Sequence, residues 1–399
     1  MPCRLERSRG NPLGPWHRTM VMSILLSRPA TRNHSVASVG VLDSPTPGPR
    51  PGARPQPATR PKPAPPAIAL GYSPFPLDAD AHHFGLTTSA MLLKGGTVVV
   101  RHGRRSNSDT ATILLHGAAG SWTTWTPLLQ AAEATARDLT DLIIPDLPGW
   151  GDSPRAADES SVGVESMAEL VADVARSLGY ERWNVVGHSM GGFIALQLAA
   201  SEPSATSSVG LVSATSFSIQ NSVRHPIRHF WVLPAFTALL MTMRMLRLAG
   251  PLNRGLVRAV TCLGLLPALV APLFSRPRAV DPTVVAALGA EVRPAGFVLA
   301  ADRAGAYDAG TQWAQIRCPV RSVHGDDDIF VTTDDDKRLH ALVPHCVSST
   351  VPGAGHFSQI ERPLEVLLRL EFAVPLPIMS SRIEPARRGS PRDNARDAF

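Results

Sequence analysis

The feature of this 399-residue chain that most limits its fold is the alternation of short apolar runs with segments of helical periodicity. Predicted strands lie at 96–100, 111–115, 142–146, 183–187, 209–212 and 320–323, and 111–115 and 142–146 are the clearest apolar runs among them. Apolar residues recur at helical spacing in 166–178, 192–200 and 364–372. Buried parallel strands are continuous apolar runs, and parallel neighbours need a crossover that is usually a helix. The alternation therefore predicts an α/β domain with a mostly parallel central sheet flanked by helices.

The alternation stops between residues 213 and 317. This stretch is rich in Leu, Met, Val and Pro, shows no clear strand, and stands between two predicted sheet strands. It therefore predicts a helical cap insertion at 213–317. The core of the domain is then expected in two parts, 76–212 and 318–376.

The two ends of the chain have a different composition from the core. Residues 45–66 read PTPGPRPGARPQPATRPKPAPP, which favours extended polyproline II and offers almost nothing to bury. The apolar run 20–26 is too short for a convincing secretory signal and lacks a clear cleavage site. We expect a disordered Pro/Arg-rich leader at 1–75 and a flexible tail at 377–399.

The formal net charge of +6 is concentrated in a few segments. Residues 1–70 carry +8, residues 203–280 carry +8 from eight Arg and no acid, and residues 381–399 carry +2. The rest of the chain carries −12. Nucleic-acid binding is disfavoured, because the basic leader lacks interleaved aromatic residues and no nucleic-acid-binding module is visible. An acid-free apolar insertion instead suits an anionic membrane surface.

The cysteines constrain the compartment and the metal chemistry. The four are Cys3, Cys262, Cys318 and Cys346, with no C-x-x-C pair and no zinc-ligand spacing. A disulfide scaffold and a structural zinc site are therefore disfavoured. We expect four free thiols in a reducing compartment, hence a cytoplasmic protein, with no metal and no organic cofactor.

A G-x-S-x-G motif stands at 187–191, where a predicted strand ends and a predicted helix begins. A sharp strand-to-helix turn holds such a serine in a strained conformation with its hydroxyl exposed, and the flanking glycines let neighbouring backbone pass close by. The helix N-terminus behind the serine favours developing negative charge. Ser189 is therefore the predicted nucleophile.

A serine nucleophile needs a general base, and the base needs an acid that fixes its tautomer. Of the 13 histidines, His356 stands out because it lies on a Gly-rich loop before the last predicted helix. Carboxylates follow the 320–323 strand directly, as Asp326, Asp327 and Asp328. His188 and His324 are expected to have structural roles.

The first buried strand ends in the small-residue turn HGAAGSW, at 116–122. Such a turn can direct a backbone N–H into a pocket. The N–H groups of Ala118 and Met190 are the predicted oxyanion hole for a tetrahedral intermediate.

Together these motifs resemble the α/β-hydrolase fold superfamily, in its cap-bearing serine hydrolase branch. The resemblance covers about 91–376 and rests on HGAAGSW, PDLPGWGDS at 145–153, GHSMGG at 187–192, GDDD at 325–328 and GAGH at 353–356. It implies the chain order Ser, Asp, His and an acid three residues after the glycine, which is Asp328. It also implies that Asp146 and Asp152 organise loops. Serine at 189 excludes the branches with an aspartate nucleophile as close analogues.

The resemblance implies a serine hydrolase that cleaves a carboxylic ester or related acyl compound with an apolar moiety through an acyl-enzyme. Two alternatives stay open: a carbon–carbon bond hydrolase of the same fold, and a non-catalytic binding protein that retains the fold. The sequence does not indicate the substrate or the oligomeric state.

Two interpretations of the insertion also stay open. It is either a lid whose apolar residues line a substrate pocket, or a lid that in addition makes peripheral contact with an anionic membrane. A membrane span is disfavoured, because the apolar stretches 230–243 and 259–275 are short of the roughly 20 residues needed. Pro267 and Pro272 interrupt the second stretch, and Arg244, Arg247, Arg254 and Arg258 separate the two.

Overall fold

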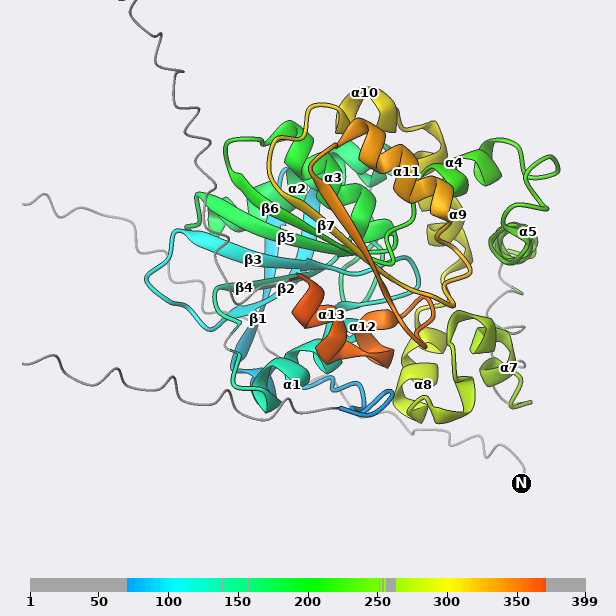
Figure 1. Ribbon diagram of the computed structural model, residues 1–399, viewed down its shortest axis with the longest axis horizontal. Helices are drawn as coiled ribbons and strands as arrows, with labels where there is room; N and C mark the ends of the chain where they lie inside the picture. Colours follow the sequence, from blue (N-terminus) through cyan, green and yellow to red (C-terminus); the bar gives the residue numbers. More distant parts are fainter. Residues whose placement is uncertain are drawn as a thin grey trace, which may run out of the picture. The chain divides into compact units, whose positions relative to one another are not determined.

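An eight-stranded sheet forms the centre of the computed structural model, which describes residues 70–370 except 138, 157, 251, 253–254 and 256–262 (Figure 1). The strand order is β1-β2-β4-β3-β5-β6-β7-β8. The strands are β1 Leu86–Leu93, β2 Gly96–Gly103, β3 Thr110–Leu115, β4 Leu142–Asp146, β5 Arg182–His188, β6 Thr206–Val212, β7 Val320–Gly325 and β8 Cys346–Val351. β2 runs antiparallel to β1 and β4, and every other neighbouring pair is parallel. The predicted mostly parallel sheet is confirmed.

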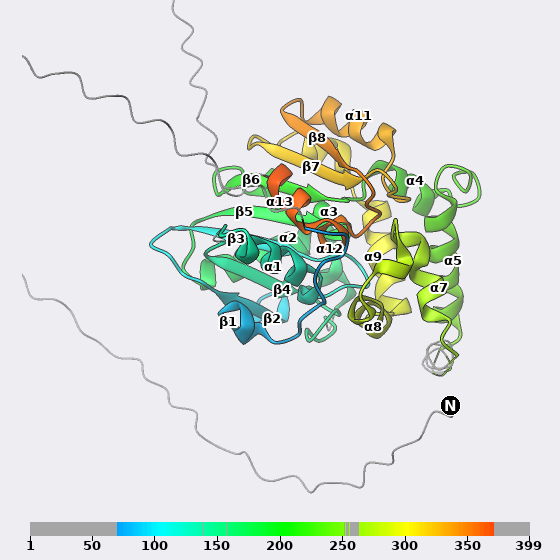
Figure 2. The same cartoon turned by 60° about the horizontal axis from the view of Figure 1, so that its bottom comes forward.

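Helices cover both faces of the sheet (Figures 1 and 2). One face carries α2 Val164–Ser177, α3 Met190–Ser201 and α10 Ala309–Trp313, and the other carries α1 Thr126–Ala134, α12 Ser358–Glu361 and α13 Pro363–Leu370. α11 Thr333–Leu342 contacts β8. Short 3₁₀ turns lie at η1 Ala81–Phe84, η2 Trp122–Trp125 and η3 Glu159–Val162.

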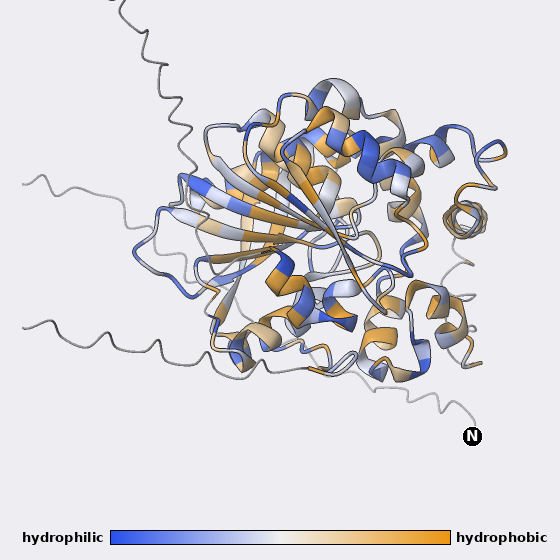
Figure 3. Ribbon diagram, in the orientation of Figure 1, coloured by the Kyte–Doolittle hydropathy of each residue, from blue (hydrophilic) through white to orange (hydrophobic). Residues whose placement is uncertain are grey.

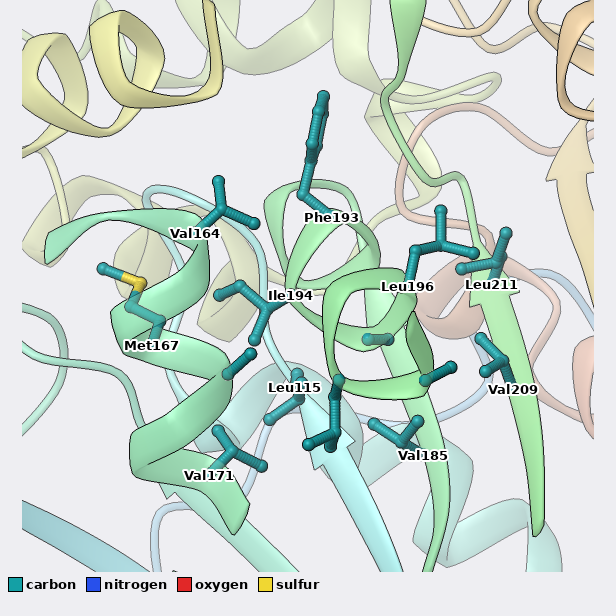
Figure 4. Close-up of a cluster of buried hydrophobic side chains, with 14 of the residues drawn as sticks. Leu115, Val164, Met167, Val171, Val185, Phe193, Ile194, Leu196, Val209 and Leu211 are labelled. Carbon is teal, nitrogen blue, oxygen red and sulfur yellow. The ribbon is translucent and has the colours of Figure 1, made fainter. Parts of the chain in front are cut away.

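The strands supply a core on each side because successive side chains point to opposite faces. On β5, Val185 joins the apolar cluster under α2 and α3, whereas Val186 joins the cluster under α1 and α13. Figure 4 shows the first cluster, in which Leu115 of β3 lies near Ile194 of α3 and Leu211 of β6 lies beside Leu196 of α3. α3 is buried over almost its whole length, which fixes the position of the turn that precedes it.

Residues 213–319 lie between β6 and β7 and are named here the β6–β7 insertion. Their described residues form helices and turns, with no strand among them. The helices are α4 Phe217–Arg224, α5 Pro234–Leu248, α7 Leu266–Val270, η4 Ala271–Leu273, η5 Pro277–Ala279, α8 Pro282–Ala290 and α9 Pro294–Ala306, followed by α10. In both views α4, α5, α7, α8 and α9 gather at one end of the sheet (Figures 1 and 2).

No single described helix meets both the length and the hydropathy that crossing a bilayer requires. One bent pair, Pro282–Ala290 with Pro294–Ala306, meets them jointly, with an angle of 81° between its two helices.

The two edge strands β1 and β8 were not predicted. Both contain exposed residues between covered ones, so neither has the continuous apolar run that marks the inner strands. The assignment of residues 70–75 to a disordered leader was wrong. The backbone N–H of Ser73 donates to the carbonyl of Glu361 at 2.8 Å, and the Tyr72 hydroxyl donates to its carboxylate at 2.6 Å. The rest of the leader, the tail 377–399, Cys3, Cys262, Arg254 and Arg258 lie outside the described residues.

Candidate active site

Ser189 lies on the sharp turn between β5 and α3, with φ of +51°. A positive φ is unfavourable for a residue with a Cβ, so the surrounding packing must hold it. Two glycines make this packing feasible. A Cβ on Gly187 would lie 2.2 Å from the carbonyl oxygen of Gly191, and a Cβ on Gly191 would lie 2.4 Å from that of Leu115. The G-x-S-x-G spacing is therefore a steric requirement of the turn.

His356 lies on the loop after β8, and its Nε2 is 3.0 Å from Ser189 Oγ. Its side chain is only 4% exposed, which keeps bulk water away from the pair. The β6–β7 insertion fixes its backbone, because the His356 N–H donates to the carbonyl of Leu273 at 2.8 Å. Gly355 permits that approach, since a Cβ there would lie 2.6 Å from the same carbonyl oxygen.

Asp328 follows β7, and its two carboxylate oxygens lie 3.0 and 3.2 Å from Nδ1 of His356. Burial by itself raises the pKa of Asp328. The electrostatic interaction and hydrogen bond with His356, the Phe330 N–H and the Ser213 hydroxyl outweigh it, so the pKa of Asp328 lies below its usual value. The ionised carboxylate accepts a hydrogen bond from Nδ1–H of His356, which leaves the Nε2 lone pair directed at Ser189.

The other two carboxylates of the GDDD motif face elsewhere. Asp326 accepts from the N–H of Gly353 at 2.7 Å, and Asp327 accepts from the Ser275 hydroxyl at 2.6 Å. Of the three, Asp328 is therefore the one that the structure places against His356, as the resemblance implied.

The turn after β3 brings Ala118 beside Ser189 and Met190 at one cavity. Within the described residues, no hydrogen bond occupies the backbone N–H of Ala118 or Met190. His116 holds the base of this turn, with Nδ1–H donating to the Gly117 carbonyl at 2.8 Å and Nε2 accepting from the Leu147 N–H at 2.9 Å. Burial lowers the pKa of His116, so the ring is neutral, as these two bonds require.

Asp146 and Asp152 stabilise loops, and Arg101 forms ion pairs with both of them. The buried carboxylate of Asp146 pairs with Arg101 and accepts from the N–H groups of Trp122 and Asp152, each at 2.9 Å. The largely exposed carboxylate of Asp152 also pairs with Arg101. The contribution of Arg101 was not predicted, because it comes from β2 and nothing in its local sequence marks it.

His188 and His324 are bound to other groups. His188 donates Nε2–H to the backbone carbonyl of His356 at 3.0 Å and packs against its ring at 5.1 Å between centroids. Burial, together with the neighbouring charge of His356, lowers the pKa of His188 to about 3. His324 lies 3.0 Å from Asp336, away from Ser189.

The neutral state of His188 predicts a pH-dependent contribution to stability. The folded protein keeps this ring neutral, whereas the unfolded chain takes up a proton below an ordinary histidine pKa of about 6.5. Stability is therefore lost as the pH falls from 7.5 to 5.5, by about 1.4 kcal/mol from this group. Urea unfolding at the two pH values should show that His188→Gln removes about this much of the loss. The exposed His345→Gln is the matched control, and equal losses in wild type and His188→Gln would contradict the argument.

Glu361 is a buried carboxylate that sequence reasoning missed. It accepts from the N–H of Gly355 and from the N–H of Ser275, each at 2.9 Å, and from Tyr72. Burial raises the pKa of Glu361 in spite of these bonds. One side chain thus ties together the His356 loop, the β6–β7 insertion and the segment before β1. The partners are up to 289 residues apart, so no local signal could reveal them.

A cavity of about 640 Å³ lies over Ser189 and His356. The β6–β7 insertion supplies most of the lining residues, chiefly from α5, α7 and α9, with Phe236, Leu266 and Phe297 among them. No Asp, Glu, Lys or Arg is among the described residues that line it. In the part of the chain that the structure describes, no group of three or more His, Cys, Asp and Glu side chains is placed to hold a metal ion.

Comparison with known proteins agrees with this architecture. A protein of Shigella flexneri named as a carbamate hydrolase, RutD, is 28% identical over 255 residues, which are 63% of this chain and 86% of that protein. The 2-hydroxy-6-oxononadienedioate/2-hydroxy-6-oxononatrienedioate hydrolase of Paraburkholderia phymatum is 34% identical over 117 residues, 28% of this chain and 39% of its own.

A solved structure from Nostoc sp. PCC 7120, described as an alpha/beta hydrolase, shares the fold with a TM-score of 0.57 and 20% identity. The match covers 72% of this chain and 97% of that one. The model of the alpha/beta hydrolase fold family matches residues 111–363, well over half of the chain. Because the strand order, the sharp turn at Ser189 and the family match agree, this chain belongs to the alpha/beta hydrolase fold family.

Proposed function

We propose that the protein is a serine hydrolase that cleaves a carboxylic ester, or a related acyl compound, with an apolar acyl group. The observation that supports this best is the chain of hydrogen bonds from Asp328 through His356 to Ser189, which ends in an apolar cavity. The β6–β7 insertion serves as the lid of that cavity in this proposal.

In the proposed first half-reaction, Ser189 Oγ attacks the acyl carbonyl carbon and its proton passes to Nε2 of His356. The N–H groups of Ala118 and Met190 stabilise the resulting oxyanion, and Asp328 stabilises the imidazolium. Collapse of the tetrahedral intermediate breaks the ester C–O bond, and His356 gives its proton to the leaving alcohol. In the second half-reaction His356 takes a proton from water as the water oxygen attacks the acyl carbon. Collapse of the second tetrahedral intermediate breaks the bond between that carbon and Ser189 Oγ, His356 returns its proton to Oγ, and the acid is released.

The cavity predicts how activity depends on acyl chain length. Each buried methylene contributes about 0.8 kcal/mol, which is about fourfold in kcat/KM when it is realised in the transition state. The kcat/KM for p-nitrophenyl acetate, butyrate, hexanoate and octanoate should therefore rise by about fourfold per methylene until the cavity is filled. In Ala301→Leu, which narrows the lining, the longer esters should lose this advantage while the acetate keeps its rate. If kcat/KM of the wild type does not change with acyl chain length, the proposal of an apolar acyl pocket is wrong.

The carbon–carbon hydrolase alternative draws support from the Paraburkholderia relative, whose named substrates are dicarboxylates. The described lining of the present cavity offers no Lys or Arg to pair with a substrate carboxylate, which favours the ester. Faster release of a chromophoric dienoate than of p-nitrophenol would reverse this preference. Failure to react with a fluorophosphonate probe would instead favour a non-catalytic binding protein.

A further inference from the structure

The exposed apolar side chains of this protein are concentrated on one part of its surface. Among the described residues, eleven of the fourteen exposed large apolar side chains belong to the β6–β7 insertion. The most exposed include Ile227 at 91%, Trp231 at 86% and Leu248 at 81%. Single exposed apolar residues are ordinary, but a cluster of this extent marks an interaction site.

This cluster lies on the side of the insertion that faces away from the sheet. It comprises the turn segment 225–233, α5 and α7, which form the outer edge of the structure in the second view (Figure 2). The hydropathy colouring shows apolar residues on α7 (Figure 3). We name these exposed apolar side chains of 225–233, α5 and α7 the outer apolar surface.

The cavity opens onto the outer apolar surface. On α5, Leu239 and Met243 line the cavity, whereas Met245 and Leu248 are exposed. Some residues do both: Ala238 and Thr242 of α5, Leu269 of α7 and Pro272 of η4 line the cavity and are exposed. These four therefore mark the mouth of the cavity, between α5 and the α7–η4 segment.

The segment that carries the outer apolar surface has charged side chains of one sign. Residues 203–280 contain eight Arg and no Asp or Glu. Arg228 and Arg247 are exposed next to Ile227 and Leu248, and Arg244 pairs with Asp302 of α9. Basic residues beside exposed Trp and aliphatic side chains suit the interface of a bilayer that contains acidic lipids.

We propose that the outer apolar surface docks on an anionic lipid bilayer. Trp231, Leu248 and their apolar neighbours enter the head-group region, while Arg228 and Arg247 meet the lipid phosphates. The mouth of the cavity then faces the membrane, so an apolar acyl substrate reaches Ser189 from the lipid without crossing water. Docking is independent of the proposed function; only the entry of substrate rests on it.

The test is flotation of the full-length chain with vesicles of phosphatidylcholine alone or with about one third phosphatidylglycerol, at low and at physiological salt. Wild type should partition at least tenfold more to the anionic vesicles. Trp231→Asp/Leu248→Asp should reduce this at least tenfold, and Arg228→Glu/Arg247→Glu should abolish the preference for anionic lipid. Val347→Asp/Leu368→Asp, at exposed apolar positions outside the insertion, is the matched control.

Every variant keeps the basic residues 1–70, so binding through that segment alone would leave all variants equal to wild type and overturn the proposal. Equal binding to both vesicle types would also overturn it. A third outcome would also overturn the proposal: wild type does not bind vesicles, sedimentation velocity shows that it is a dimer, and Trp231→Asp/Leu248→Asp is a monomer. Turnover of soluble p-nitrophenyl butyrate by Trp231→Asp/Leu248→Asp shows that the variant is folded. Ser189→Ala should float like wild type, which separates docking from catalysis.

Discussion

Replacing Ser189 by alanine is expected to lower kcat/KM for p-nitrophenyl esters by about 10⁴-fold or more. The variant loses the hydroxyl oxygen that lies 3.0 Å from Nε2 of His356, while the apolar cavity and the candidate oxyanion N–H groups remain. Steady-state kinetics with p-nitrophenyl butyrate and circular dichroism at equal concentration measure activity and fold together. Ser201→Ala, at the far end of α3, is the matched control and should keep full activity.

Combining substitutions tests whether these residues act as one unit. His356→Ala should lose activity to a similar extent, and Ser189→Ala/His356→Ala should lose no more than either single variant, because neither residue works without the other. Additive losses would mean that Ser189 and His356 contribute separately and would contradict the proposed transfer of a proton between them. If Ser189→Ala turned over the ester at the wild-type rate, Ser189 would not be the nucleophile.

The inner part of the fold was predictable because its signals are local. The strands β3 and β4 are short, mostly apolar runs, and Gly187 and Gly191 are required where backbone segments pass within van der Waals contact. The edge strands escaped prediction because half of their residues face solvent. In β8, with the sequence CVSSTV, only the two end residues are buried, and its serines are typical of a loop.

The arrangement of Ser189, Asp328 and His356 could be anticipated from motif order, but the groups that hold them could not. Glu361 and Leu273 fix the His356 loop through backbone hydrogen bonds, and neither stands in a recognisable motif. Leu273 also lines the cavity. Movement of the β6–β7 insertion therefore acts on the loop that carries the proposed general base, and this coupling exists only in three dimensions.

The second prediction with a large expected effect on activity concerns which carboxylate of the GDDD motif orients His356. Asp328→Asn should lower kcat by about 10³ to 10⁴-fold, because the amide carries no negative charge and can donate its NH2 to Nδ1, which holds His356 in the wrong tautomer. The substitution keeps the side-chain volume, so the loop should remain folded. The measurement is kcat for p-nitrophenyl butyrate from pH 6 to 9.

Asp327→Asn is the matched control for Asp328→Asn, since it changes the same chemical group one residue away. Its carboxylate meets the Ser275 hydroxyl of the insertion at 2.6 Å and does not contact His356. This variant should keep kcat within about threefold, with any change falling on KM for long acyl esters, because an insertion contact has been weakened. A loss of kcat in Asp327→Asn equal to that in Asp328→Asn would show that the acid acts through the charge of the whole motif. The geometry predicts the opposite, since Asp328 alone of the three carboxylates lies within hydrogen-bond distance of Nδ1.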